Sequence, residues 1–176
     1  MFDHVISELK NLFSAGEISG TEARLRFVTL PQNQAVKAVK YLNEKQGYRH
    51  LVLLTAVDYI EQGQFQLTYL LHNPENRTDI GVRVLIDREN ATMESAHTLW
   101  PTIATYQREL REMFGIQFPG SPGVDDDFIL EGWRGLPPYR RDFDTKAFAE
   151  SFFPQREGRG TNDPAAFMKE KLYPNE

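Results

Sequence analysis

Three segments rich in strand-forming residues follow one another closely in the middle of the chain. They read HLVLLTAVDYI at 50–60, QFQLTYLLH at 64–72 and DIGVRVLID at 79–87, and only EQG and NPENRT separate them. Connections this short join antiparallel neighbours, because a crossover between parallel strands takes a dozen or more residues. The sequence therefore predicts an antiparallel meander. Its first segment is apolar almost throughout from Leu51 to Val57, which predicts a central strand covered on both faces.

Helical and strand patterns precede the meander. Residues 2–13 place apolar side chains at helical spacing, and Gly16 follows where a helix would stop. Residues 23–30 alternate with period two, as a half-buried strand requires. Pro31 then opens a second helix, which Gly47 ends.

A further helix is predicted after the meander, at residues 95–115. Ser95 is its expected N-cap, and Pro101 is expected to kink or restart it. The complete order of elements predicts a two-layer α+β domain over residues 1–116. We expect a mostly antiparallel sheet of about four strands with flanking helices.

The composition excludes several classes of function. Of the 176 residues, 40% are hydrophobic, so the chain can bury a core of its own. It contains no cysteine, which excludes disulfides, thiolate-ligated zinc, cysteine-ligated iron–sulfur clusters and cysteine nucleophiles. A net charge of −5 without a run of Lys or Arg argues against nucleic acid as a partner. No signal peptide or membrane-spanning stretch is evident, so we expect a cytosolic protein that meets a membrane only through partners.

Residues 117–176 differ in character from the preceding domain. They are rich in Pro, Gly and charge, yet aromatic residues are dispersed singly along them. Because disordered tails are usually poor in aromatics, we expect an extended segment anchored to its own domain or to a neighbour. The aromatic residues are Phe118, Phe128, Trp133, Tyr139, Phe143, Phe148, Phe152, Phe153, Phe167 and Tyr173.

The segment YQRELREMFGI at 106–116 concentrates charge near the end of the last predicted helix. Gly115 fits the left-handed position just past a helix end. On composition alone, this is a solvated helix face with intrahelical pairs such as Arg108 with Glu112. Helical spacing places four polar side chains outward and that of Glu109 near the edge of the apolar face. The four outward residues are Gln107, Arg108, Arg111 and Glu112.

The order of residues across three pieces of the chain carries more information than composition. The pieces are YRHLVLLTAVDY at 48–59, LWPTIATYQRELREMFGI at 99–116 and FPGSPGVDDDFILEGWRGLPPYRRDF at 118–143. Together with the meander, they resemble the C-type subunit of proton-pumping NADH:quinone oxidoreductase, respiratory complex I. They also resemble its relatives in membrane-bound energy-converting hydrogenases.

Some positions depart from the family's usual pattern. Gln107 stands where the family usually has a glutamate, Glu112 replaces the commoner aspartate, and Ser121 occupies a position where histidine is usual. These departures leave open the branch of the family and therefore the electron donor.

The resemblance implies a noncatalytic peripheral-arm subunit that binds no cofactor itself. It implies contacts with the large, hydrogenase-like D-type subunit and with the iron–sulfur subunits of types B and I, on the cytoplasmic side of the cell membrane. The whole complex would pass electrons from NADH or a ferredoxin-type donor, through clusters in its partners, to quinone, coupled to proton translocation. Residues 117–176 are expected to dock on these partners. The residues expected at the interfaces are Arg108, Glu109, Glu112, Gly115, Trp133, Arg140, Arg141 and Asp142.

Three alternatives remain open from the sequence. The first is the equivalent subunit of a membrane-bound NiFe hydrogenase. The second is a stand-alone metal-dependent hydrolase, since Asp125, Asp126 and Asp127 lie together near Glu131 and hard cations bind several carboxylate oxygens. The third is a soluble adaptor that binds peptides along a sheet edge, which its aromatic tail covers when no peptide is bound.

Overall fold

The computed structural model describes residues 2–20 and 24–152 of the chain. The chain divides into two units, residues 1–143 and 144–176, and the first unit contains every element except the last helix. None of the helices in the described ranges has the length and apolar character needed to cross a membrane. The elements, in order, are α1 (Phe2–Phe13), β1 (Ile18–Ser19), β2 (Leu25–Leu30), α2 (Gln32–Lys45), β3 (His50–Tyr59), the short 3₁₀ helix η1 (Ile60–Gln62), β4 (Gln64–Asn73), β5 (Thr78–Asp87), α3 (Ile103–Phe114) and α4 (Thr145–Phe152).

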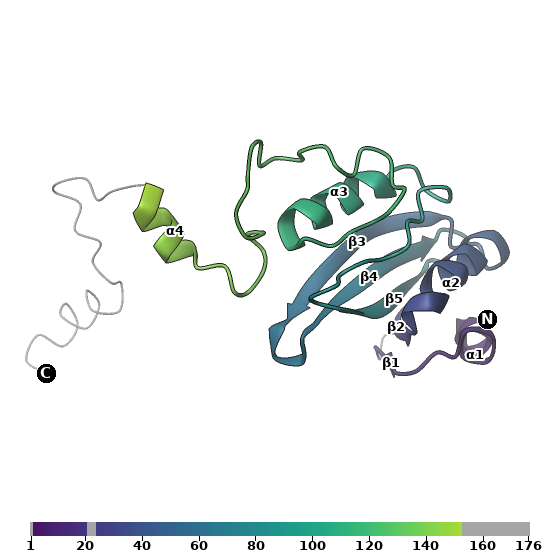
Figure 1. Cartoon of the computed structure of the whole chain (residues 1–176). Helices are drawn as coiled ribbons and strands as arrows, with labels where there is room; N and C mark the ends of the chain where they lie inside the picture. The colour runs from purple at the N-terminus through teal and green to yellow at the C-terminus, as the bar shows by residue number, and fades with distance from the viewer. Residues whose placement is uncertain (1, 21–23, 153–176) are drawn as a thin grey trace, which may run out of the picture. The chain divides into compact units, whose positions relative to one another are not determined.

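The described strands form one sheet in the order β1-β2-β5-β4-β3 (Figure 1). β3, β4 and β5 form the predicted antiparallel meander, in which Leu67 pairs with Ala56 on one side and with Val84 on the other. β2 lies parallel to β5, with Val28 opposite Val82, and β1 adds a short antiparallel edge. The predicted α+β class is confirmed, and the additional strand is the two-residue β1.

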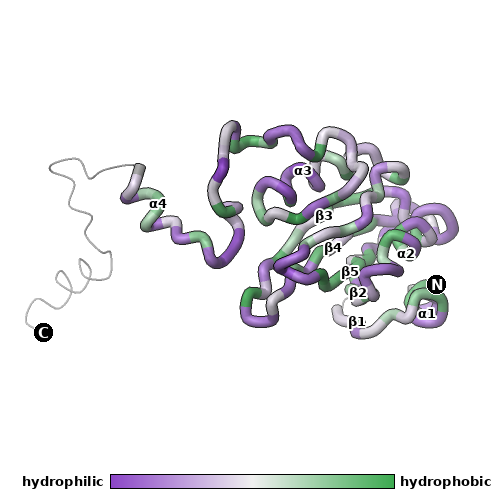
Figure 2. The backbone as a smooth tube through the Cα atoms, viewed as in Figure 1, coloured by the Kyte–Doolittle hydropathy of each residue, from purple (hydrophilic) through white to green (hydrophobic). Residues whose placement is uncertain are grey.

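One face of the sheet is buried and carries the helices. Along β4 the side chains of Phe65, Leu67, Tyr69 and Leu71 are buried, and the residues between them are partly exposed. α2 contacts β5 and α3 contacts β3, so both helices lie on this buried face (Figure 1). Figure 2 shows hydrophobic residues, in green, gathered along the inner strands of the sheet. The result is a two-layer domain.

β3 is an edge strand, so the prediction of a central strand was wrong. The central position belongs to β5, which lies between β2 and β4. Burial alternates along most of β3, and Val52 and Val57 remain 36% and 44% exposed. The apolar sequence was misleading because β3 carries apolar side chains on both faces, although the helices cover only one of them.

α3 is shorter than the helix predicted at residues 95–115. It begins at Ile103, because Pro101 has no N–H to donate and so cannot continue a helix toward its N-terminus. Ser95 does not cap the helix. Its hydroxyl lies 2.7 Å from Oε1 of Gln107, so it bonds to the middle of α3 instead of its start.

Candidate partner-docking site

Residues 117–143, called the α3 loop below, follow α3 and run back along its outer side (Figure 1). Gly115 makes the reversal possible with a left-handed backbone, φ 82°, at the helix end. Phe118 and Val124 of the loop are buried, and the Tyr139 N–H donates to the Met113 carbonyl at 3.0 Å. α3 therefore lies between the sheet and its own loop.

Gln107 is fully buried, and its predicted outward position was wrong. The hydroxyls of Ser95 and Ser121 both donate to its Oε1, at 2.7 and 2.6 Å. Helical spacing alone suggested an exposed residue. It gives no sign that a loop from later in the sequence covers this side of α3. A buried amide with hydroxyl donors on both sides fixes the start of the loop against the helix.

Glu112 holds the middle of the α3 loop through backbone bonds. Its carboxylate accepts N–H groups from Phe128 at 2.6 Å, Ile129 at 2.9 Å and Leu130 at 3.0 Å. Hydrogen bonds to an ionised carboxylate are roughly twice as strong as neutral ones. The structure thus gives Glu112 an intramolecular role, and the predicted ion pair with Arg108 does not form among the described residues.

The remaining charged residues of α3 are divided between the loop and the surface. Arg111 pairs with Asp125 at 2.7 Å, and the Arg108 guanidinium lies 5.5 Å from the centre of the Phe128 ring. Glu109 is half-buried and makes no hydrogen bond or ion pair with any described residue. Of these side chains, Glu109 therefore has the most freedom to contact another molecule.

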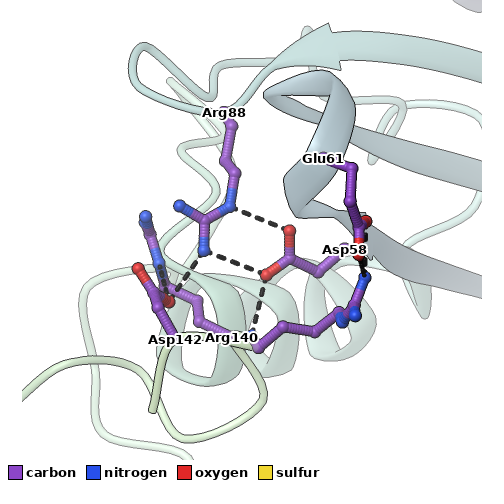
Figure 3. Close-up of polar contacts among 6 residues, drawn as sticks. Asp58, Glu61, Arg88, Arg140 and Asp142 are labelled. Atoms are coloured by element: carbon purple, nitrogen blue, oxygen red, sulfur yellow. Dashed lines mark hydrogen bonds and ion pairs between the residues drawn. The ribbon is translucent and has the colours of Figure 1, made fainter.

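A buried ion-pair network fixes the far end of the loop. Asp58, near the end of β3, and Arg88, directly after β5, are only 2% and 7% exposed at their side chains. Arg88 donates to both carboxylate oxygens of Asp58, at 2.8 and 3.1 Å, and to Asp142 at 2.7 Å. Figure 3 shows its guanidinium between the two carboxylates. The Arg141 N–H also donates to Asp58, at 2.9 Å, and Arg140 pairs with Asp142 at 3.3 Å.

The charges in this network shift one another's pKa values. Burial alone would raise the pKa of Asp58, but hydrogen bonds from Arg88 and the Arg141 N–H outweigh it and lower that pKa below its usual value. The hydrogen bond from Arg88 likewise lowers the pKa of Asp142. In return, the hydrogen bond to Asp58 raises the pKa of Arg88. All three groups are therefore charged at neutral pH.

The structure brings some of the predicted interface residues together and separates others. Arg140, Arg141 and Asp142 join the Asp58 network, and Arg141 also pairs with the exposed Glu61. The Trp133 ring is tilted against the ring of Phe143, the residue after Asp142, with 5.8 Å between the ring centres. The predicted anchors Phe153, Phe167 and Tyr173 lie outside the described residues.

Two residues of this network, Asp58 and Arg88, were missed as site residues. Asp58 ends the apolar run of β3, and an acid at the end of a buried strand indicates a buried partner. Arg88 carries no comparable signal, because its partners lie 30 and 54 positions away in the sequence.

The structure does not support a hydrolase site at Asp125–Asp127. Asp125 pairs with Arg111, and Asp127 accepts the Gly132 N–H at 3.2 Å. In the described part of the chain, no group of three or more His, Asp or Glu side chains is placed to hold a metal ion. The stand-alone metal-dependent hydrolase is therefore not retained.

Comparison with known proteins identifies the family of the chain. The family model described as "Respiratory-chain NADH dehydrogenase, 30 Kd subunit" matches residues 28–149. The C-type subunit of the NADH-quinone oxidoreductase of Moorella thermoacetica is 32% identical over 147 residues, covering 80% of this chain and 94% of that protein. A C/D-type subunit of the NADH-quinone oxidoreductase of Aquifex aeolicus is 30% identical over 117 residues, covering 66% of this chain and 20% of that protein.

A solved structure agrees with the sequence matches. It is that of the membrane-bound sulfane sulfur reductase, an archaeal respiratory membrane complex, and one of its chains is 25% identical with a TM-score of 0.82. The match covers 92% of this chain and 96% of that one. The chain belongs to the family of the respiratory-chain NADH dehydrogenase 30-kDa subunit, the C-type subunit of NADH-quinone oxidoreductases.

Proposed function

We propose that the chain is a noncatalytic peripheral-arm subunit of a membrane-bound NADH:quinone oxidoreductase, or of a form that uses a ferredoxin-type donor. The observation that carries the proposal is the family match over residues 28–149. The folded domain adds support, because its polar clusters hold the α3 loop in place. In this proposal the chemistry, including proton translocation, belongs to the whole complex.

The proposed partners are the large, hydrogenase-like D-type subunit, called the large subunit below, and the iron–sulfur subunits of types B and I. The Aquifex aeolicus relative supports the first of these, since its name joins the C-type and D-type subunits in one protein. Assembly with them would place the chain on the cytoplasmic side of the cell membrane. The clusters and quinone would be bound by these partners, since this chain has no cysteine to ligate an ordinary cluster.

The proposed task is to hold the large subunit beside the chain of clusters. Electron tunnelling slows steeply with distance, so a loosened neighbour would slow transfer through the whole complex. We assign the folded scaffold to residues 1–116 and partner docking to residues 117–176. Support comes from α3 and the sheet, which together give the α3 loop a rigid base.

A second candidate is the equivalent subunit of a membrane complex with another electron acceptor, as in the energy-converting hydrogenases. The TM-score of 0.82 to a chain of the sulfane sulfur reductase complex favours keeping this candidate. It shares the scaffold role and differs only in the donor, the acceptor and the metal of the large subunit.

The test is an affinity purification of the tagged chain from gently solubilised membranes of its host, with subunit identification and EPR detection of clusters. Co-purified clusters with a large subunit that lacks nickel support the quinone reductase. Nickel in the large subunit supports the hydrogenase form of the second candidate. A lone chain without clusters contradicts both.

A further inference from the structure

The α3 loop exposes three large apolar side chains within a short stretch of sequence. Ile129 is 66% exposed, Leu136 40% and Tyr139 57%. The other large apolar side chains exposed among the described residues are Leu12 on α1, Val52, Val57 and Tyr59 on β3, and Leu85 on β5. Isolated exposed apolar residues are ordinary, but a group of them indicates a contact surface.

The chain at or next to each of these three positions is held near the last turn of α3. The Ile129 N–H donates to Glu112, and the Tyr139 N–H donates to the Met113 carbonyl. The Tyr139 ring meets the Phe114 ring edge to face at 5.7 Å. Pro137, next to Leu136, lies close to Gly115. Segments that are separate in the loop thus meet at one end of one helix, and each carries an exposed apolar side chain.

The polar groups that hold the α3 loop have their partners inside the chain. Glu112 uses its carboxylate on three backbone N–H groups, and Asp142 uses its carboxylate on Arg88 and Arg140. A side chain with its hydrogen bonds already made gains little from a further partner. Such an arrangement instead removes the entropic cost of ordering the loop when another protein binds.

We propose that Ile129, Leu136 and Tyr139, called the apolar rim below, make the direct contact with the large subunit. Glu112, Arg88, Asp58 and Asp142 are positioning residues that hold the rim in its binding conformation before the partner arrives. This inference rests on the proposed function, because it takes the large subunit as the occupant.

Two observations favour the large subunit over other occupants of the rim. The name of the Aquifex aeolicus relative places its C-type and D-type parts in one protein, which keeps these two parts together. Ile129 of the rim also lies between Asp127 and Glu131 in the sequence of a chain of net charge −5, which disfavours an anionic lipid surface.

The contact is tested with the double variant Ile129→Ser/Leu136→Ser in the full tagged chain, purified from host membranes. We expect the amount of co-purified large subunit to fall about tenfold relative to wild type, with the thermal midpoint of the isolated chain unchanged. Leu12→Ser is the matched control, because Leu12 is 58% exposed on α1, away from the loop. It should leave co-purification at the wild-type level.

The positioning role is tested with Glu112→Gln. In the isolated chain, we expect the amides of residues 128–130 to exchange with deuterium at least about tenfold faster than in wild type, because their charged acceptor is lost. The Ile129→Ser/Leu136→Ser variant should leave this exchange rate unchanged at 128 and 130. Unchanged exchange in Glu112→Gln would overturn the positioning role.

The outcomes separate this inference from the proposed function. If wild type recovers no large subunit, the proposed function fails. If the wild-type chain recovers the large subunit and the double variant recovers as much of it as Leu12→Ser does, the apolar rim is not the contact and the inference fails. Light scattering that shows a wild-type dimer and a monomeric double variant would assign the rim to a second copy. Flotation of wild type alone with phosphatidylcholine vesicles would assign it to lipid. Either result overturns the inference.

Discussion

The Asp58 carboxylate is 2% exposed and lies against the Arg88 guanidinium. Replacing Asp58 removes two of the hydrogen bonds that compensate the buried Arg88 charge and leaves its contact with Asp142. We expect Asp58→Asn to lower the free energy of unfolding by about 3 kcal/mol, measured by urea denaturation of the isolated chain. Glu61→Gln is the control, because its pair with Arg141 is exposed and should contribute little. Equal effects of the two variants would contradict the network's role.

The same residues predict how stability depends on pH. The pKa values of Asp58 and Asp142 are lower in the folded chain than in the unfolded chain, where Asp titrates at about 3.9. Their contribution is therefore complete above about pH 5 and is lost as pH falls through about 4 toward the lower folded values. Urea denaturation between about pH 7 and 2.5 should show this loss in wild type, and an Asp58→Asn/Asp142→Asn variant should show a flatter profile.

Gly81 is a residue whose missing side chain matters. It lies opposite Phe27 across β2 and β5, and a Cβ atom there would overlap the Phe27 ring. The Arg83 guanidinium lies 4.0 Å from the centre of that ring. We expect Gly81→Ala to lower the free energy of unfolding by about 1–3 kcal/mol, because the ring must move. A double-mutant cycle with Phe27→Ala should show strong coupling, whereas additive costs would refute the overlap.

At the scale of elements, α3 depends on how it ends. Gly115 has a φ of 82°, and a Cβ there would meet Pro137 at 3.4 Å. A side chain in the left-handed region costs about 1–2 kcal/mol, so Gly115→Ala should lower the free energy of unfolding by about that amount. Gly115→Asn should cost less, because Asn tolerates this conformation better. Denaturation of both variants checks the order, and an equal cost would remove backbone strain as the cause.

Local patterns in the sequence predicted the helices α1 and α2 and the β3–β5 meander, because these depend on spacing and on turn residues. They did not predict that β3 lies at an edge. Strand order depends on which strand of the meander pairs with β2, and that strand is β5. Nor did they predict the burial of Gln107, which depends on Ser121 in a loop that packs back on α3. The Asp58 network joins positions up to 83 residues apart, which no local pattern encodes.

At the scale of the whole molecule, the division at residue 143 makes a prediction about independent folding. A chain ending at Phe143 keeps the sheet, α3 and the Asp58 network, so its thermal midpoint should match that of the full chain within about 2 °C. Its co-purification with the large subunit should fall, because residues 144–176 are proposed to dock on partners. A large loss of stability would show instead that these residues support the first unit.

The edge position of β3 has a consequence for the cell's control of this chain. Among the described residues, no strand pairs with its outer side, so much of this ten-residue strand offers a backbone edge to other chains, although the Val52 carbonyl accepts the Tyr106 hydroxyl. Under the proposed assembly, copies made in excess of the large subunit carry this edge and the apolar rim uncovered, and so are candidates for aggregation and for degradation. Synthesis of this chain in balance with the large subunit then helps to keep the protein folded. Joining the C-type and D-type subunits in one polypeptide, as the name of the Aquifex aeolicus relative indicates, sets their ratio at translation.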